Sequence, residues 1–126
     1  MNKNNKSSYL VYVAVPYLNR SNKVINSRFE KVTRFSARLV SEGYRPYSPI
    51  THNHLINKYL DLSLEHHDWL KYDFLFLKHC KKLFVLKLPG WEDSIGVAAE
   101  IKMAKKLGIP VVYNGIEELE GLLECI

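Results

Sequence analysis

Three short apolar runs alternate with longer segments of helical character, and this alternation limits the folds open to the chain. Residues 9–15 read YLVYVAV, residues 83–88 read LFVLKL and residues 109–113 read IPVVY. Runs with so few polar residues are typical of strands covered on both faces, as in parallel sheets. Strands separated by helices favour parallel pairing through right-handed crossovers. We therefore predict a single-domain α/β protein, a Rossmann- or flavodoxin-like three-layer sandwich with a parallel sheet of four to five strands.

The segments between these runs carry helical periodicity or helix stops. Apolar residues from Ile25 to Leu39 recur at steps of three and four, and Gly43 closes that helix. Residues 50–61 show no clear period and are expected to form a loop with at most one helical turn. The remaining predictions are a polar, flexible leader over 1–8, one domain over 9–126, a short strand over 44–47, and helices over 62–80, 94–107 and 116–123.

Composition excludes several classes of protein. In 126 residues with a formal net charge of +5, the basic residues are scattered, which argues against a nucleic-acid polymer as partner. No apolar run approaches the roughly 20 residues of a membrane span, and no signal-peptide pattern opens the chain. Cys80, expected to pack at a helix end, and Cys125 are too few for a disulfide framework. We expect a cytoplasmic protein without a membrane partner.

Ligands of open parallel sheets bind beyond the carboxyl ends of the strands, which directs attention to the loops over 16–23, 49–57 and 89–93. The first loop contains neither G-x-G-x-x-G nor a P-loop motif, so classical dinucleotide enzymes and P-loop kinases are disfavoured. The adjacent His66 and His67 point to different helix faces, a poor arrangement for a shared metal ion. We predict neither a metal nor a cofactor.

The third loop leads directly from a strand into a helix. Ser94 and the free backbone amides of the first helical turn can receive an anion, and Gly96 lets a ligand approach the backbone. Glu100 follows in the second turn, beside the apolar face of the helix, where a partly buried carboxylate has the properties of a nucleophile or base. The alternative is that Ser94 only caps the helix and that Glu100 is a surface residue.

Residues 88–112, LPGWEDSIGVAAEIKMAKKLGIPVV, and the opening strand YVAVPY resemble the nucleoside 2-deoxyribosyltransferase-like superfamily. The similarity is to its small bacterial and phage domains with the motif L-P-G-W-E-x-S-x-G-x-x-x-E, which are related to nucleoside 5′-monophosphate N-glycosidases, and it covers about residues 9–113. It implies that Glu100 attacks the anomeric carbon of a sugar and that Tyr12 helps to position it. It also implies that Asp73, or as second choice Asp68, protonates the leaving base.

The resemblance further implies a substrate. Ser94 matches a residue that faces the 5′ position of the sugar, and a serine there favours a nucleoside or deoxynucleoside 5′-monophosphate over a free nucleoside. Other expected substrate contacts are Gly90, Gly96 and Trp91 in the third loop, Tyr17 and Arg20 (or Arg28) in the first, and His54 or Asn53 near the base. Trp91 is expected either to wall the pocket or to anchor its loop. Related domains commonly complete their pockets with a neighbouring copy, so a homo-oligomer, at least a dimer, is expected.

Three functional hypotheses follow. The first is an N-glycosidase or deoxyribosyltransferase that cleaves or exchanges the base through a glycosyl-enzyme intermediate. The second is a non-catalytic module that binds, senses or sequesters a nucleotide or an ADP-ribose derivative. The third is a structural or regulatory subunit with a vestigial pocket.

Overall fold

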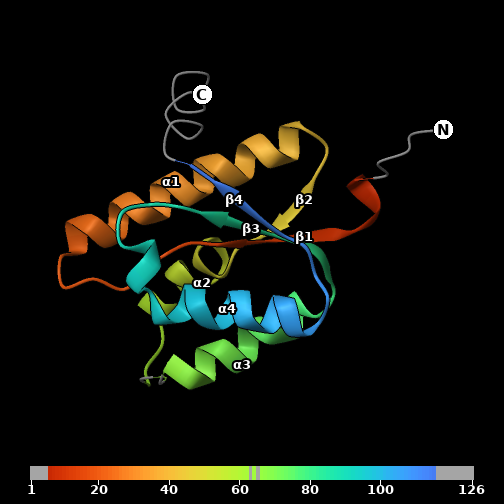
Figure 1. Ribbon diagram of the computed structural model, residues 1–126. Helices are drawn as coiled ribbons and strands as arrows, with labels where there is room; N and C mark the ends of the chain where they lie inside the picture. Colours follow the sequence, from red (N-terminus) through yellow and green to blue (C-terminus); the bar gives the residue numbers. More distant parts are fainter. Residues whose placement is uncertain (1–5, 63, 65, 116–126) are drawn as a thin grey trace.

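The computed structural model describes residues 6–62, 64 and 66–115, and its centre is a four-stranded parallel sheet (Figure 1). The strands β1 (Leu10–Ala14), β2 (Arg45–Tyr47), β3 (Cys80–Leu86) and β4 (Val111–Asn114) stand in the order β2-β1-β3-β4. The chain moves outward from β1 to β2 and then returns across β1 to build β3 and β4. The strand order therefore reverses between β1 and β3, which is the place where ligands bind in sheets of this kind.

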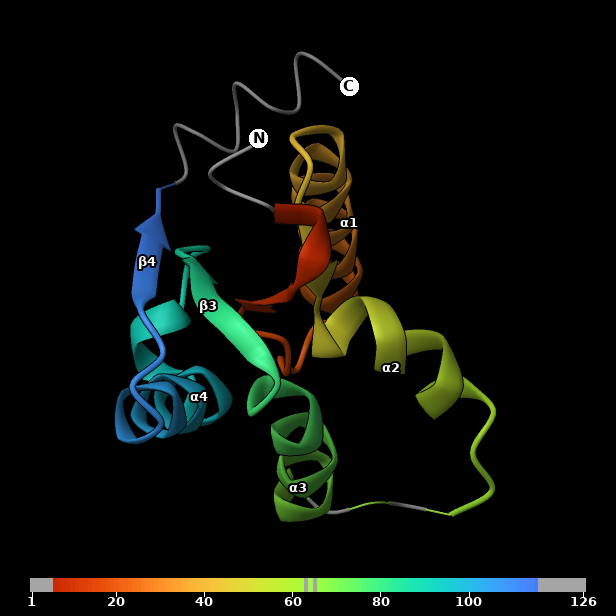
Figure 2. The ribbon, with the colours of Figure 1, turned by 90° about the vertical axis from the view of Figure 1, so that its right-hand side faces the viewer.

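Helices cover both faces of the sheet, which confirms the predicted three-layer α/β architecture. Helix α1 (Asn22–Ser41) lies on one face, whereas α3 (His66–Leu77) and α4 (Ile95–Lys106) lie on the other (Figure 2). Each face has its own apolar core, one formed with Val32, Phe35 and Leu39 of α1 and one formed with Leu77, Val97 and Ala104 of α3 and α4. The central strands are apolar along nearly their whole length because their side chains pack into a core on each face of the sheet.

The alternation of side chains along β1 places one polar group, the Tyr12 hydroxyl, on the face covered by α3 and α4. Val11, Val13 and Val15 pack toward α1, and Tyr12 and Ala14 pack toward α3 and α4. Tyr12 is 0% exposed. Its hydroxyl must therefore find a partner inside the protein.

The segment after β2 differs from the sequence prediction. The loop expected over 50–61 is largely helical. Helix α2 spans Pro49–Lys58 and begins at the N-cap Ser48, whose hydroxyl oxygen accepts from the Ile50 backbone N–H at 3.2 Å. Pro49 occupies the first turn, a position that proline favours. Pro49 is also the only buried residue of α2, so no apolar stripe marks the helix in the sequence.

The boundaries around α3 also differ from the prediction. The helix spans His66–Leu77 rather than 62–80, and Leu64 precedes it with an exposed side chain. Strand β3 begins at Cys80, three residues earlier than expected, so Cys80 packs as a buried strand residue and not at a helix end. Short 3-10 turns, η1 and η2, are formed by Lys6–Ser8, within the expected leader, and by Trp91–Asp93. The rest of the leader, the predicted helix over 116–123 and Cys125 lie outside the described residues.

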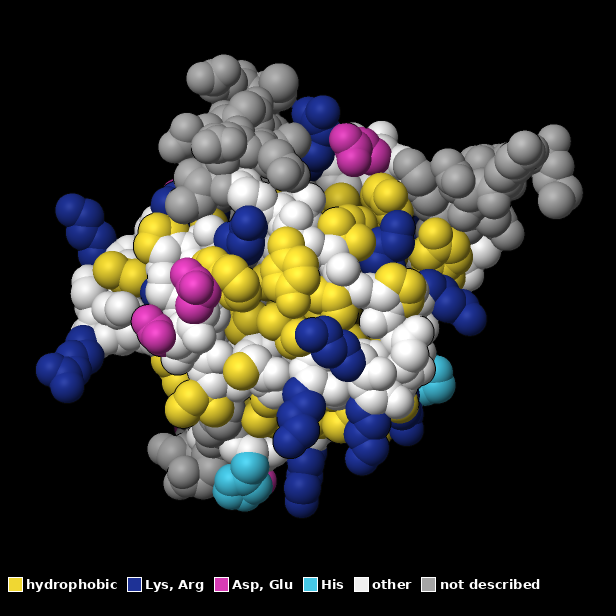
Figure 3. Space-filling model, in the orientation of Figure 1, with side chains coloured by type: hydrophobic (Ala, Val, Ile, Leu, Met, Phe, Trp, Pro, Cys, Tyr) yellow, Lys and Arg dark blue, Asp and Glu magenta, His cyan; other side chains and the backbone are white. Residues whose placement is uncertain are grey.

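Among the described residues, no helix combines the length and the apolar character needed to cross a bilayer. Lysine and arginine side chains project from several separate places around the face seen in Figure 3.

Candidate active site

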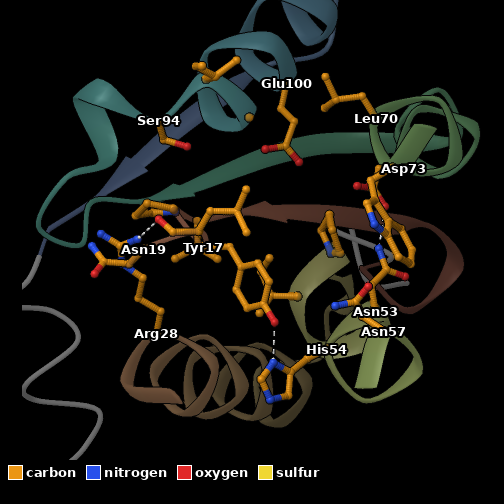
Figure 4. A pocket seen from close by; sticks show the side chains of 18 of the residues that line it. Tyr17, Asn19, Arg28, Asn53, His54, Asn57, Leu70, Asp73, Ser94 and Glu100 are labelled. Atoms are coloured by element: carbon orange, nitrogen blue, oxygen red, sulfur yellow. Dashed lines mark hydrogen bonds between the residues drawn. The ribbon is translucent and has the colours of Figure 1, made fainter. Parts of the chain in front are cut away.

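A pocket of about 740 Å³ opens beyond the carboxyl ends of β1 and β3, at the reversal of strand order. Its walls come from the loop after β1, from α2 and α3, and from the first two turns of α4 (Figure 4). A volume of this size lies within the range of roughly 300–1,000 Å³ of small-ligand sites.

Glu100 is a buried carboxyl group that lines this pocket. It lies in the second turn of α4 and is 5% exposed, and the Tyr12 hydroxyl donates a hydrogen bond to its Oε2 atom. Burial raises the pKa of Glu100 to about 8, with the Tyr12 hydrogen bond acting to lower it and the negative charge of Asp73 to raise it. Tyr12 in turn has a pKa raised well above its usual value by burial and by Glu100, so it remains a hydrogen-bond donor.

Asp73 is a second carboxyl group in the same pocket. It lies on α3 and is 6% exposed, and its Oδ1 atom accepts hydrogen bonds from Asn53 Nδ2 at 3.0 Å and from the Tyr47 hydroxyl at 3.4 Å. Burial raises the pKa of Asp73 to about 6, although both hydrogen bonds and the nearby His52 lower it. The pocket therefore holds two carboxyl groups of different acidity, an arrangement that can divide nucleophile and acid roles.

The first turn of α4 forms another part of the wall. Ser94 is the N-cap, and its hydroxyl oxygen accepts from the Val97 backbone N–H at 3.2 Å. That hydroxyl remains able to donate toward a ligand. The backbone N–H groups of Ile95 and Gly96 belong to the first turn, where a helix offers no internal acceptor, and both residues line the pocket.

Arg28 ties together the loops that follow β1 and β3. This α1 residue is 9% exposed, and its guanidinium donates to the backbone carbonyls of Leu18 at 3.0 Å and Pro89 at 2.9 Å. Gly90 adopts a φ of 93°, and a Cβ atom there would lie 2.9 Å from Arg28 Nη2. Glycine thus permits both the turn and the close approach of the arginine.

A contact between the side chains of Tyr17 and His54 joins the loop after β1 to α2 at the wall of the pocket. The Tyr17 hydroxyl lies 2.6 Å from His54 Nδ1, and the imidazole stacks on Phe29 with ring centroids 4.1 Å apart. The two side chains meet on the side of the pocket opposite α4 (Figure 4).

The structure brings most of the predicted site residues together. The pocket is lined by Glu100, Asp73, Ser94, Gly96, Gly90, Tyr17 and His54, and Tyr12 reaches it through Glu100. Trp91 and Arg20 are not among the lining residues. The Trp91 ring packs against Tyr113 with centroids 5.8 Å apart and against the core below α4, the contacts of a loop anchor, whereas Arg20 is exposed. Asp68 is also outside the pocket and lies 3.4 Å from His67.

Sequence reasoning missed several residues that line the pocket or support it. The supporting residue is Tyr47, and the lining ones include Asn57, Trp69 and Leu70. The sequence did contain one signal, the Ser48-Pro49 pair, which is typical of a helix start and marks the beginning of α2. A helix from this point predicts that Asn53 and Asn57, four residues apart, lie on one face. Within the described part of the chain, no group of three or more His, Cys, Asp or Glu side chains is arranged to hold a metal ion.

The fold and the pocket define an α/β protein with a parallel sheet and a ligand-sized pocket at the reversal of its strand order. Its structure is similar to that of a 2-deoxyribosyltransferase from the psychrotolerant bacterium Bacillus psychrosaccharolyticus, characterised as a biocatalyst for nucleoside synthesis. The TM-score is 0.60 and the sequence identity 21%, over 84% of this chain and 72% of the other. The sequence model of a family described as a domain of unknown function, DUF1937, matches residues 9–115, and the chain belongs to this family. No curated protein sequence matches the chain.

Proposed function

We propose that this protein cleaves the N-glycosidic bond of a nucleoside or deoxynucleoside 5′-monophosphate, or exchanges its base, with Glu100 as nucleophile. The observation that carries the proposal is a buried carboxyl group that faces a ligand-sized pocket and is oriented by a buried tyrosine. A carboxylate that is largely removed from bulk water is suited to attack on a sugar carbon that develops positive charge.

The second carboxyl group supplies the proton that the leaving base needs. In the proposed first step, a Glu100 oxygen forms a bond to the anomeric carbon as the bond from that carbon to the base nitrogen breaks. Asp73 transfers its proton to the departing base and becomes a carboxylate. In the second step, Asp73 accepts a proton from an incoming water molecule or second base, which attacks the anomeric carbon and releases Glu100.

The layout of the pocket supports a nucleotide orientation. Arg28, Asn19 and Ser94 lie toward one end of the view in Figure 4, Asp73, Asn53 and Asn57 lie toward the other, and Glu100 lies between them. The end with the guanidinium, the serine hydroxyl and the first-turn amides suits a 5′-phosphate. The end with Asp73 and the two asparagines suits a hydrogen-bonding base.

Two general observations support glycosyl chemistry over other uses of the pocket. The fold is shared with a protein characterised as a 2-deoxyribosyltransferase. Ser94 and Glu100, six positions apart in the sequence, are brought to the same pocket by one helix. We favour hydrolysis over base exchange because no feature of the described residues selects a base as acceptor in preference to water.

One observation favours a second function, the binding of a nucleotide or ADP-ribose derivative without turnover. Burial raises the pKa of Glu100 to about 8, so at neutral pH the majority form of this group in the ligand-free protein is the uncharged acid. An uncharged acid is a poor nucleophile, and it leaves the pocket less repulsive toward an anionic ligand.

The proposed reaction is tested by incubating the protein with ribo- and deoxyribonucleosides and their 5′-monophosphates and measuring free base by chromatography. We expect base release from monophosphates, loss of at least about 100-fold in Glu100→Gln, and wild-type rates in the exposed control Glu92→Gln. Release that persists in Glu100→Gln contradicts the nucleophile. Calorimetric binding of a nucleotide without release of base supports the binding module instead.

The phosphate end is tested by Ser94→Asp. Aspartate also caps helices, so the fold should be retained, whereas its charge repels a phosphate. We expect the ratio of kcat/KM for the monophosphate to that for the nucleoside to fall by about tenfold or more, which corresponds to about 1.4 kcal/mol. An unchanged ratio places the phosphate elsewhere.

A further inference from the structure

The hydrogen bonds that Asp73 receives from described residues all reach one of its oxygens. Asn53 Nδ2 and the Tyr47 hydroxyl both donate to Oδ1, at 3.0 and 3.4 Å. Tyr47 is held in place by its stacking on Phe76, with ring centroids 4.1 Å apart and an interplanar angle of 7°. When an oxygen accepts from both an amide and a hydroxyl, its two lone pairs are engaged and neither is available to bind a proton. Within the described part of the chain, no hydrogen bond reaches the other oxygen, Oδ2.

Asn53 is itself oriented by its neighbour in the sequence. His52 Nδ1 lies 2.7 Å from Asn53 Oδ1, and an amide oxygen can only accept, so Nδ1 carries the hydrogen in this contact. With its oxygen engaged by His52, the amide must present its NH₂ group to Asp73. His52 is enclosed by the rings of Tyr47, Tyr72 and Phe76, at centroid distances of 5.5, 5.7 and 5.7 Å.

We propose that Asn53, oriented by His52, is a positioning residue that reserves Asp73 Oδ2 for the acid proton and keeps that proton available to the leaving base. This inference rests on the proposed function and specifies how its acid is prepared. In the protonated acid the hydrogen occupies Oδ2, because Oδ1 already accepts two donors. As the base leaves, the bond between Oδ2 and hydrogen breaks, the hydrogen joins a base nitrogen, and the electron pair stays on the carboxylate.

The same two donors stabilise the product of that transfer. Hydrogen bonds to a carboxylate are stronger than those to a neutral acid, so the contacts from Asn53 and Tyr47 strengthen as negative charge develops. The ionisable groups around Asp73 are Tyr47 on β2, His52 on α2, Tyr12 on β1 and Glu100 on α4. Both tyrosines have pKa values raised by burial and stay neutral. Glu100 is therefore the neighbouring acid whose titration bears on Asp73.

Two substrates whose leaving groups differ in basicity can show whether Asn53 positions the acid or only supports the structure. A nucleotide needs a proton on its departing base, whereas a 4-nitrophenyl glycoside 5-phosphate releases a nitrophenolate that leaves without one. We expect Asn53→Leu to lower kcat for the nucleotide by about tenfold or more and kcat for the nitrophenyl glycoside by less than about threefold. The same change at an exposed site, Asn26→Leu on α1, serves as the control and should alter neither rate.

Substitutions of His52 test the second link. His52→Phe keeps a ring among the aromatic neighbours and removes the donor, whereas His52→Asn keeps an N–H close to the position of Nδ1. The phenylalanine variant should show the selective loss of nucleotide turnover, and the asparagine variant should recover most of it. An equal loss with both substrates in Asn53→Leu, or equal behaviour of the two His52 variants, overturns the inference.

A measurement without substrate distinguishes failure of this inference from failure of the proposed function. Carbon-13 NMR titration of the Asp73 carboxyl group should give a higher pKa in Asn53→Leu than in the wild type, because a donor to the ionised form is lost. An unchanged titration overturns the positioning role even if the wild type releases base through Glu100. Absence of base release from every nucleotide overturns the proposed function, and with it the acid role of Asp73, whatever the titration shows.

Discussion

The Tyr12 hydroxyl donates a hydrogen bond to Glu100 Oε2, linking two buried side chains that are 88 residues apart in the sequence. The bond engages one oxygen of the carboxyl group, so the other oxygen, Oε1, is the attacking atom in the proposed reaction. It also favours the ionised form of Glu100, because a donated hydrogen bond lowers the pKa of the acceptor. Tyr12 is therefore expected to matter for reaction and not only for packing.

Tyr12→Phe should lower kcat/KM by about 10- to 100-fold, the equivalent of one hydrogen bond to a charged group. Loss of this donor should also raise the pKa of Glu100 further, so the alkaline limb of the pH–rate profile should move upward. Tyr113→Phe, which removes the same hydroxyl from an exposed position on β4, is the matched control. A Tyr12→Phe variant with an unchanged alkaline limb would contradict the assignment.

The pH dependence expected of the proposed reaction follows from the two carboxyl groups. Burial raises the pKa of Glu100 to about 8 and that of Asp73 to about 6, so the pair holds a single proton between these values. The proposed reaction needs an ionised Glu100 and a protonated Asp73. This is the minority arrangement, about 1% of the singly protonated form when the two pKa values differ by about two. We expect kcat/KM to be bell-shaped, declining below about pH 6 and above about pH 8. A profile that is flat from pH 5 to 9 would refute the pairing.

Burial of Glu100 should reduce the stability of the protein at alkaline pH. The pKa of this group rises from 4.5 to about 8 on folding, so the folded state binds more protons than the unfolded state between these values. Within that window the free energy of unfolding falls as pH rises, by about 1.4 kcal/mol per pH unit from this group. Below the lower value the folded and unfolded states are both protonated, and the penalty vanishes.

Glu100→Gln removes this dependence while its amide oxygen can still accept from Tyr12. Urea denaturation should show the variant to be more stable than the wild type at pH 8.5 by a few kcal/mol, with a much smaller difference at pH 4.5. Comparison with Glu92→Gln removes the general effect of losing one surface carboxylate. Equal stability of the wild type and Glu100→Gln at pH 8.5 would mean that the carboxylate is hydrated in the folded state.

The central sheet was predictable from the sequence because burial on both faces leaves a strong local pattern. Residues Val11–Val15 are all at most 5% exposed, and their apolar run is visible without knowledge of any partner. Helix α2, in contrast, was not predictable from the sequence. Its polar residues Asn53, His54 and Asn57 line the pocket instead of facing a core, so an apolar period could not arise.

The same contrast applies to the candidate site. Ser94, Gly96 and Glu100 lie within two turns of one helix, so their spacing made a shared site one of two open readings, the other being a helix cap and a surface carboxylate. The contacts that hold Asp73 were not predictable in this way. They come from Tyr47 and Asn53, 26 and 20 residues away, and depend on how β2 and α2 pack beside α3. Long-range geometry of this kind leaves no spacing signal in a single sequence.

The junction of Arg28 with Gly90 offers a test in which one glycine serves as the control for another. Gly90 and Gly108 have φ values of 93° and 73°, so alanine at either position introduces backbone strain of about 1 kcal/mol. At Gly90 the new Cβ would also lie 2.9 Å from Arg28 Nη2, whereas at Gly108 no atom of the surroundings lies within 4 Å. Gly90→Ala must therefore displace the guanidinium and weaken its bonds to Leu18 and Pro89.

We expect both alanine variants to lose stability in urea denaturation, with Gly90→Ala losing about 1–2 kcal/mol more because two hydrogen bonds of a buried cation are disturbed. Only Gly90→Ala should raise the KM for a 5′-monophosphate, since the loops tied by Arg28 form the end of the pocket assigned to the phosphate. Equal losses of stability would show that the arginine moves aside without penalty. A KM raised to the same extent in Gly108→Ala would show that the effect arises from general loosening of the fold and not from the tie between the two loops.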